Sequence, residues 1–447
     1  MNIISRVITK GSYWALRINQ SLFFKVYVFI SGLVKSPKHF KKKIVLLPTG
    51  DPLIGKKLTE GNYFFAGVLL DPELQNPWLI NSPSLEVESF LQGFYWLNDL
   101  AAIGTYRARS LAISWTNKWH EHSFITQKVS WDPEITALRS VNFLRNWDLL
   151  KNSSQERTNQ YLINIRQQYF YLYAAEKKLV ANLAKIRVLH ALFLLSVAYQ
   201  DSSRRKKKIS HKLCKNILKC IDKQGHISSR NPEELSEYFF IINEVINNSE
   251  KLISISEFNY LILNALKIKI APILRGLRLG NGFLIRSHGG DFGSVALIDK
   301  YLVQSDVKIG PSSTNLMGFE RITAGRLTLL VDCAKPAENL DSFNAHASCL
   351  SFELTSGQRP IFVHCGPGGR FGTAFKRYCR STQAHNSCTL DSVSQVQFEI
   401  ISRNERWPDE FLLSGPKNVT MERQRTLDAT WLNLSHDSFE ELYGYVH

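Results

Sequence analysis

The sequence contains no C-x-x-C pair, although it has seven cysteines in 447 residues. An odd number of cysteines without paired spacing excludes a zinc ribbon and argues against a disulfide framework. We therefore expect reduced thiols that mostly serve packing. The cysteines are Cys214, Cys220, Cys333, Cys349, Cys365, Cys379 and Cys388.

The sequence also lacks an apolar run long enough to cross a bilayer. Residues 20–36, QSLFFKVYVFISGLVKS, follow Arg6, Lys10 and Arg17 and so imitate a signal peptide. Lys25 interrupts the apolar run, and no small-residue cleavage site follows it. We interpret the segment as an amphipathic or buried helix, with a helix on a membrane surface as the alternative. No transmembrane segment is predicted.

Acidic residues are scarce relative to basic ones, because 39 Asp and Glu face 55 Lys and Arg and leave a net charge of +16. Such a field favours an anionic partner, which can be nucleic acid, acidic lipid or acidic polysaccharide. No helix-turn-helix, zinc finger or aromatic-basic sheet motif supports nucleic acid, so we predict none as a partner. The densest basic run, SRRKKKISHK from Ser203, is interpreted as a solvated loop between two helices, with a binding patch as the alternative.

The composition is that of a folded protein, with 44% hydrophobic and 21% charged residues. A chain of this length exceeds one ordinary core and predicts two domains. Residues 84–270 carry apolar side chains at helical spacing with little Gly or Pro. SWDPEITALRSVNFLRNWDLL shows the pattern well, with Asp132 as a helix cap and Pro133 in the first turn.

The pattern changes between residues 275 and 310. Glycines cluster in GNGFLIRSHGGDFGS, and short segments then alternate with period two. Helices followed by strands predict segregated helical and sheet domains. The strand pattern continues to the last residues of the sequence, ELYGYVH, so the sheet domain could be incomplete. The predicted strands are RLTLLVD, CLSFEL, PIFVHC, NSCTLDS and VQFEI.

Three histidines, His346, His364 and His385, lie in the strand region. If their strands are neighbours, the imidazoles can converge on one metal ion, such as a structural zinc. Their spacing matches no short metal motif, and packing histidines with single hydrogen bonds are the alternative.

A second polar group lies in GHISSRNPEEL, where His226, Arg230 and Asn231 precede a proline and two acidic residues. Asn231 before Pro232 is a good helix cap. Helix capping explains the presence of Asn231, but it does not explain why His226 and Arg230 lie beside it.

Several segments together resemble the heparinase II/III family. GFERITAGRLTLLVDCAKPA, AHASCLSFELTSGQRPIFVHCG and KRYCRSTQAHNSCTLD resemble its C-terminal sheet domain. GHISSRNPEEL, NYFFAGVLL, FYWLNDL and WDPEITALRSVNFL resemble the helical toroid that precedes it in bacterial members. The resemblance covers most of the chain and is strongest from Gly318 to Asp391.

The resemblance implies an (α/α) toroid followed by an antiparallel β-sandwich. It implies an N-terminal extension over residues 1–83, the toroid over 84–300 and the sandwich over 301–447. Family enzymes cleave acidic polysaccharides by β-elimination, with no required cofactor. The expected partner is therefore an acidic polysaccharide, and the expected location is the cell envelope or periplasm, although no clean signal peptide is visible.

The resemblance also implies roles for single residues. Asn231 falls where the family neutralises the substrate carboxylate, and His346 falls at the general base or acid. The proton donor is usually a tyrosine, for which Tyr238 is the first choice and Tyr260 and Tyr378 stay open. The remaining expected site residues are His385 for catalysis, His226, Arg230, Arg377 and Trp131 for substrate, and His346, His364 and His385 for metal.

The sequence departs from the family pattern at three positions. Asn344 replaces the first histidine of a paired H-x-H, Ser348 replaces an aspartate, and Leu279 stands where a histidine is expected. Two functions follow as expectations. The first is a lyase acting on a uronate-containing glycan; the second is a catalytically weakened glycan-binding or envelope-assembly protein of the same fold.

Overall fold

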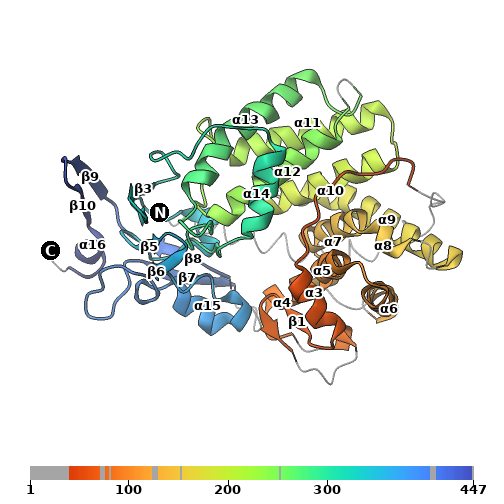
Figure 1. Cartoon of the computed structure of the whole chain (residues 1–447), viewed down its shortest axis with the longest axis horizontal. Coiled ribbons are helices and arrows are strands. Elements are labelled where there is room, and N and C mark those ends of the chain that lie inside the picture. The colour runs from red at the N-terminus through yellow and green to blue at the C-terminus, as the bar shows by residue number, and fades with distance from the viewer. Residues whose placement is uncertain are drawn as a thin grey trace. The chain divides into compact units, whose positions relative to one another are not determined.

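The structure is a computed structural model, and it describes residues 40–70, 76–79, 82–122, 129–151, 154–250, 253–402 and 409–444 (Figure 1). The N-terminal segment interpreted above as an amphipathic, buried or membrane-surface helix lies outside these residues. Among the described residues, no helix combines the length and the apolar character needed to span a membrane.

The chain divides into two compact units whose boundaries fall inside helices. Unit 1 contains the described residues up to Lys219 together with Glu244–Leu263. Unit 2 contains Cys220–Asn243 and Asn264–His447. Three helical segments, within residues 232–243, 264–276 and 295–304, are therefore grouped with the strands, whereas the predicted boundaries at 84 and 301 follow composition along the chain. Those boundaries stay predictions.

Helices make up nearly all the regular structure before residue 305. The sequence predicts three helices within residues 130–200, and the structure has helices α7 to α10 in this range. The helices are α3 (Pro52–Thr59), α4 (Leu85–Gln92), α5 (Tyr95–Ile103), α6 (Tyr106–His122), α7 (Pro133–Arg145), α8 (Trp147–Leu150), α9 (Gln155–Ala175), α10 (Leu183–Ala198), α11 (Ser203–Cys220), α12 (Pro232–Asn248), α13 (Glu257–Gly276) and α14 (Val295–Gln304).

Helix α7 begins where its cap predicts. The Asp132 carboxylate accepts hydrogen bonds from the backbone N–H groups of Glu134 and Ile135, at 2.9 and 3.4 Å. These bonds satisfy two of the donors that a helix start leaves unpaired. Helix α10 is mostly apolar and buries thirteen of its sixteen residues, as expected of a central helix in a helical domain.

The basic run from Ser203 is a helix, and its interpretation as a loop was wrong. Residues Ser203–Cys220 form α11, which buries Ile209, Leu213 and Ile217 on one side. These positions are four residues apart and share one helix face, so the lysines between them occupy the solvent face. Charge density concealed an amphipathic helix.

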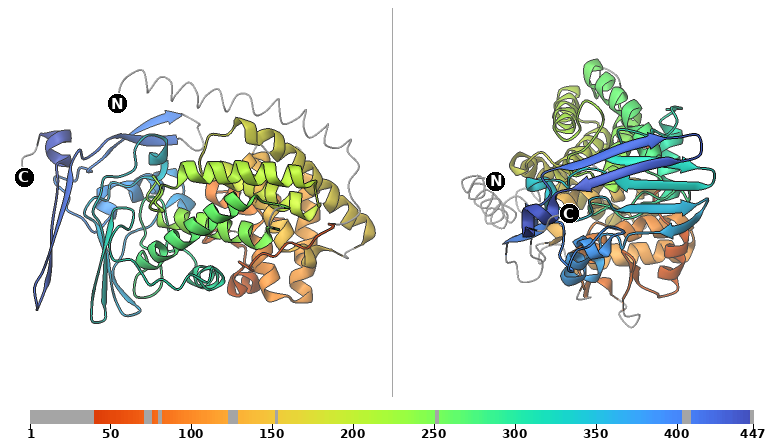
Figure 2. Two further views of the ribbon diagram at one scale, coloured as in Figure 1. Left: turned by 90° about the horizontal axis from the view of Figure 1, so that it is seen from above. Right: turned by 90° about the vertical axis from the view of Figure 1, so that its left-hand side faces the viewer.

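The strands of unit 2 form antiparallel sheets. The largest has the order β3-β4-β5-β6, and β7-β8 and β9-β10 are separate hairpins. An ion pair between Arg423 on β9 and Glu320 on β3 links the last hairpin to the large sheet, and Figure 2 shows them side by side. The strands are β3 (Phe319–Ala324), β4 (Leu327–Asp332), β5 (Phe352–Ser356), β6 (Arg359–Phe362), β7 (Gln397–Ser402), β8 (Asp409–Ser414), β9 (Val419–Arg425) and β10 (Thr430–His436), with β1 (Phe64–Phe65) and β2 (Val68–Leu69) in unit 1 and short helices α15 (Thr373–Arg380) and α16 (Ser438–Tyr443) in unit 2.

Strand β5 buries its polar side chains rather than its apolar ones. Glu353 and Thr355 are fully buried, whereas Phe352 and Leu354 are only partly so. Glu353 accepts the backbone N–H and side chain of Arg286, and the Thr355 hydroxyl accepts the N–H of Gly280 at 3.0 Å. The buried face of β5 therefore holds the loop that runs from α13 to α14.

Two expectations about the histidine-bearing segments need correction. Residues 386–392 form turns and an isolated bridge, not a strand, since β7 begins only at Gln397. His346 follows a 3-10 helix, and His364 follows the end of β6. Both histidines therefore flank the β5–β6 hairpin and occupy no strand position.

Candidate functional site

The candidate site lies within unit 2 and is built around Asp332, the last residue of β4. Asp332 is fully buried, and its carboxylate accepts from Arg230 and from the Ser348 hydroxyl, the latter at 3.0 Å. The His288 Nε2 atom lies 3.1 Å from the same carboxylate. Burial alone would raise the pKa of Asp332, but Arg230 and His288 outweigh it and hold the pKa well below its usual range.

Arg230 is held entirely by the protein. Its Nε donates to Met317 O at 2.7 Å, and Nη1 donates to Ala334 O and Lys335 O at 3.0 and 2.6 Å. Its Nη2 donates to Gly318 O and pairs with Asp332. The expectation that Arg230 binds substrate is therefore corrected, because its donors already have partners in the fold.

His288 is a site residue that sequence reasoning missed. It has a positive φ of 50° in the turn from Ser287 to Gly290, and its side chain is buried. Its Nδ1 accepts the backbone N–H of His346 at 3.3 Å, so Nε2 carries the proton in the neutral ring and faces Asp332. Burial lowers the pKa of His288, and Asp332 only partly offsets it.

His346 and His385 form a relay of neutral rings. The Nε2 of His346 accepts the Gly289 N–H at 3.0 Å, and its Nδ1 lies 3.0 Å from Nε2 of His385. Nδ1 of His385 lies 2.8 Å from Ser381 O, which only accepts. The partners therefore assign the proton to Nδ1 in both rings. Burial lowers the pKa of His346 well below its ordinary value and lowers that of His385 to about 3.

His364 completes the group of rings, with its centroid 5.0 Å from that of His385. Its backbone N–H donates to Glu353 at 2.7 Å, and its Nδ1 donates to Arg286 O at 2.8 Å. Its buried Nε2 has no hydrogen-bond partner in the described part of the chain. Burial lowers the pKa of His364, so this nitrogen is a neutral acceptor.

The three predicted metal histidines are neighbours, but they do not converge on one point. Nδ1 of His346 and Nε2 of His385 are hydrogen-bonded to each other. Of the three rings, His364 is the one whose Nε2 has no hydrogen-bond partner among the described residues. Within the described ranges, no group of three or more His, Cys, Asp or Glu is arranged to hold a metal ion. The arrangement therefore gives the proposed zinc ion no ligand set.

Asn231 lies against the same Ser287–Gly290 turn that His346 contacts. Its Oδ1 caps α12 by accepting from the N–H groups of Glu233 and Glu234, at 2.9 and 3.2 Å. The same oxygen lies so close to Gly290 that a Cβ there would be 2.5 Å away. The Nδ2 donor has no partner among the described residues, so capping uses only half of the amide.

The other predicted site residues lie apart from this cluster or are engaged elsewhere. His226 bonds to Asn315 O at 2.9 Å, and Arg377 pairs with Glu410. Trp131 is buried in unit 1 with its ring packed edge-on against Tyr171, so it offers sugars no open face, and this expectation is corrected. Of the tyrosines, Tyr238 is buried on α12, Tyr260 belongs to unit 1, and Tyr378 is half exposed on α15.

The C-terminal part of the chain matches a known family model. Residues 309–447 match the model described as Heparinase II/III-like, C-terminal. The chain carries a heparinase II/III-like C-terminal domain. The match contains Asp332 and three of the four clustered histidines, whereas His288 and Asn231 precede it. The family resemblance seen in the sequence is confirmed.

Two further comparisons extend beyond this heparinase II/III-like domain. FtsZ-localized protein C of Caulobacter vibrioides (strain NA1000 / CB15N) is 23% identical over 405 residues, which cover 89% of this chain and 68% of that protein. A crystal structure of heparinase III superposes with a TM-score of 0.60 and 12% identity, over 89% of this chain and 71% of that chain. A structure of heparan sulfate lyase HepC from Pedobacter heparinus gives a TM-score of 0.45 and 14% identity, over 89% and 70%.

The likeness to heparinase III confirms the predicted fold class, a helical toroid followed by an antiparallel sheet region. The polysaccharide lyase fold therefore covers most of the chain, beyond the segment that the family model matches. At this level of identity the likeness concerns the fold, and chemistry has to be argued from the residues of the cluster.

Proposed function

We propose that this protein is a polysaccharide lyase that cleaves a uronate-containing glycan by β-elimination. The observation that carries the proposal is that Asn231 and His346 both lie against one turn, Ser287–Gly290. Elimination needs a donor to the uronate carboxylate, since the proton on C5 is too weakly acidic without one, and a base to remove that proton. The free Nδ2 of Asn231 suits the first role, and neutral His346 suits the second.

The relay supports His346 as the base. A general base must offer a lone pair, and the partners of His346 leave that lone pair on Nε2. Burial lowers the pKa of His346, which keeps the ring neutral and also makes it a weaker base. Nε2 of His385 accepts a hydrogen bond from the Nδ1–H of His346 and so orients the ring, as second partners do in other histidine sites. The reactive lone pair on Nε2 is covered by the Gly289 N–H, so catalysis requires the turn to withdraw when substrate binds.

A second candidate function is glycan binding without cleavage. It is favoured by the hydrogen bond from Gly289 to His346, which leaves the base occupied, and by the substitutions at Asn344, Ser348 and Leu279. The Caulobacter relative is named for its localisation with FtsZ, and that name supports the envelope-assembly role proposed as the alternative.

The two functions are separated by assaying the full chain on a panel of uronate-containing glycans. A lyase creates unsaturated uronate ends, which absorb in the ultraviolet. We expect Asn231→Asp to reduce the cleavage rate by roughly a hundredfold or more, since it retains the capping oxygen and loses the N–H donor. His346→Gln is expected to have an effect of similar size.

Asn182→Asp is the matched control, because Asn182 caps α10 through its own Oδ1 and is exposed. It should leave both cleavage and unfolding temperature unchanged. Absence of new absorbance on every glycan, together with binding that survives both site variants, would replace the lyase with the second candidate. Equal cleavage by wild type and Asn231→Asp would show that the site is elsewhere.

A further inference from the structure

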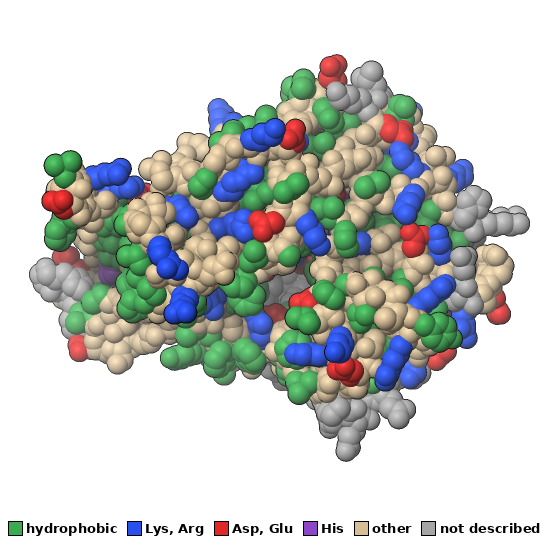
Figure 3. Space-filling model, viewed as in Figure 1, with side chains coloured by type: hydrophobic (Ala, Val, Ile, Leu, Met, Phe, Trp, Pro, Cys, Tyr) green, Lys and Arg blue, Asp and Glu red, His purple; other side chains and the backbone are tan. Residues whose placement is uncertain are grey.

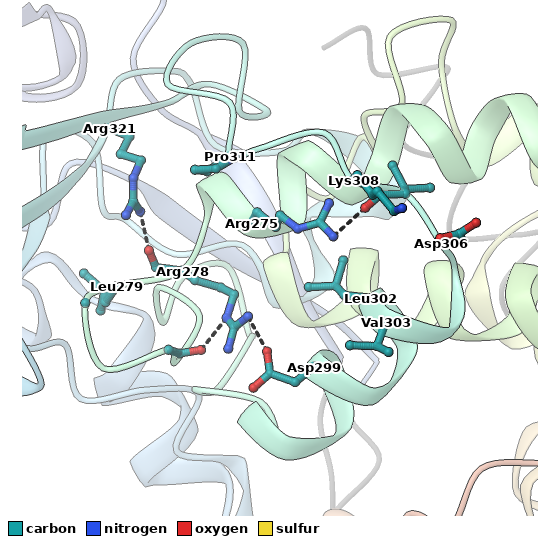
Figure 4. Close-up of a pocket in the computed structure, with 13 residues that line it drawn as sticks. Arg275, Arg278, Leu279, Asp299, Leu302, Val303, Asp306, Lys308, Pro311 and Arg321 are labelled. Carbon is teal, nitrogen blue, oxygen red and sulfur yellow. Dashed lines mark hydrogen bonds and ion pairs between the residues drawn. The ribbon is translucent and has the colours of Figure 1, made fainter.

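Unit 2 contains a cavity of about 660 Å³ that shares no lining residue with the histidine cluster. It is formed by the end of α13, the loop that follows it, helix α14, residues 306–311 and strand β3 (Figure 4). Its charged lining residues are Arg275, Arg278, Asp299, Asp306, Lys308 and Arg321.

Each arginine of the cavity is fixed to the protein by two hydrogen bonds. Arg275 donates to Ile309 O and Val307 O at 2.8 and 2.6 Å. Arg278 donates to Gly282 O and to Asp299, both at 2.7 Å. Arg321 donates to Gly276 O at 3.0 Å and to Arg278 O. Since a guanidinium has five N–H donors, each keeps three without a partner in the described part of the chain.

Positive charge in this cavity is not balanced by its acids. Four cationic side chains face two carboxylates, and Asp299 is the one that pairs with Arg278. Burial lowers the pKa of Arg275 and of Arg321, and repulsion from Arg278 lowers that of Arg275 further. Fixed cations that repel one another would be stabilised by a bound anion.

The remaining walls of the cavity are aliphatic. Leu279, Leu302, Val303, Val307 and Pro311 supply them, and the lining includes no aromatic ring. The volume falls within the range of about 300–1,000 Å³ that is typical of small-molecule sites. It therefore exceeds what a single inorganic anion fills and can accept an organic group attached to the anion.

We propose that this cavity binds a small organic sulfate or phosphate ester, whose anionic groups are held by the free donors of Arg278, Arg321 and Lys308 at separate points of the cavity wall (Figure 4). Guanidinium forks match such oxyanions in geometry, and their anchoring to backbone carbonyls means that little side-chain freedom is lost on binding. Gly282 contributes to this arrangement, because its φ is +84° and an added Cβ would lie 3.0 Å from Nη2 of Arg278.

The site does not depend on lyase activity, so its test measures binding alone. Isothermal titration calorimetry on the full chain at constant ionic strength would use three probes: inorganic sulfate, pyrophosphate and a sulfated disaccharide. We expect saturable binding of at least one organic or condensed probe. Preference for the disaccharide would indicate a glycan source, and preference for pyrophosphate would indicate a phosphorylated metabolite.

Two variants locate the site. Arg278→Lys keeps the charge and loses the fork, and we expect about tenfold weaker binding. Lys308→Gln removes an exposed charge that makes no hydrogen bond or ion pair with the residues that the structure describes, so it tests the site even if Arg278→Lys folds poorly. Lys300→Gln is the matched control, since Lys300 is an exposed lysine of α14 outside the lining.

Weaker binding in Lys308→Gln with unchanged binding in Lys300→Gln would support the site. The proposal is overturned if none of the three probes binds saturably, or if Lys308→Gln and Lys300→Gln reduce affinity equally. Neither result bears on cleavage, because the proposed lyase residues are absent from this cavity.

Discussion

At the scale of single residues, the cluster is defined by histidines that the fold keeps neutral. The pKa of His385 is lowered from 6.5 to about 3 by burial, so the folded state binds fewer protons than the unfolded state between these values. Stability contributed by neutral His385 is therefore complete above about pH 6.5 and is lost as the pH falls toward 3. The pKa of His346 is lowered in the same direction.

We predict that the free energy of unfolding falls by about 2 kcal/mol between pH 7 and pH 5 on account of His385 alone. Urea unfolding followed by circular dichroism at both pH values would measure it. His385→Gln retains an acceptor for Nδ1 of His346 but does not titrate, so its stability should change less over this range by roughly that amount. His211→Gln, at an exposed position on α11, should behave as wild type. Identical pH dependence in all three proteins would contradict a neutral relay.

Residue identity could be predicted from the sequence only where a motif pointed to it. His346, His385 and Asn231 belong to segments that resemble a family, and the structure places them around one turn. His288 and Asp332 were missed because each stands alone in sequence, His288 among glycines and Asp332 at a strand end. The carboxylate absent at Ser348 is supplied instead by Asp332, which accepts a hydrogen bond from Ser348, and only three-dimensional contacts could show this.

At the scale of elements, helices were predictable where caps and periodicity agreed. Asp132 and Pro133 mark the start of α7, and its apolar spacing gives the buried face. The failures have local causes. In α11 a high lysine content concealed Ile209, Leu213 and Ile217, and the alternation in residues 386–392 arises in turns whose polar groups bond to β5 and its neighbours, including Asn386 to Phe352 O.

The Ser287–Gly290 turn is the element on which the proposed site depends. Gly290 leaves no space for a side chain, because a Cβ would lie 2.5 Å from Oδ1 of Asn231. We predict that Gly290→Ala displaces Asn231 from its capping position, costs about 1–3 kcal/mol of stability and weakens glycan binding. Thermal unfolding and a binding assay would measure the two effects.

Gly310→Ala is the control for this substitution, since an added Cβ at Gly310 meets no atom within 4 Å. It should change neither stability nor binding. If Gly290→Ala were as stable and as active as the control, the close packing of Asn231 on the turn would be incorrect.

At the scale of the whole molecule, composition predicts two domains along the chain, and the two compact units of the structure group residues from distant parts of it. Residues Cys220–Asn243 read as part of a continuous helical region, yet they are grouped with the strands. The reason lies in Arg230, whose guanidinium bonds to four carbonyls in residues 317–335. A composition profile follows the chain and is insensitive to such long-range bonds.

The net charge of +16 gives the last prediction, which concerns the whole surface rather than one site. Figure 3 shows Lys and Arg side chains spread over the face in view, with fewer Asp and Glu among them. Charges that are dispersed and exposed act through solvent and are screened over about 8–10 Å at physiological salt.

We therefore predict that affinity for an acidic polysaccharide falls at least tenfold between about 50 and 500 mM NaCl. A neutral polysaccharide should not bind at either concentration. Asn231→Ser, which adds no charge and keeps a capping oxygen, should shift the affinity without changing the salt dependence, because the buried amide at the start of α12 adds recognition while the surface supplies attraction. Affinity that is independent of salt would mean that the basic surface has no part in drawing the polymer to the protein.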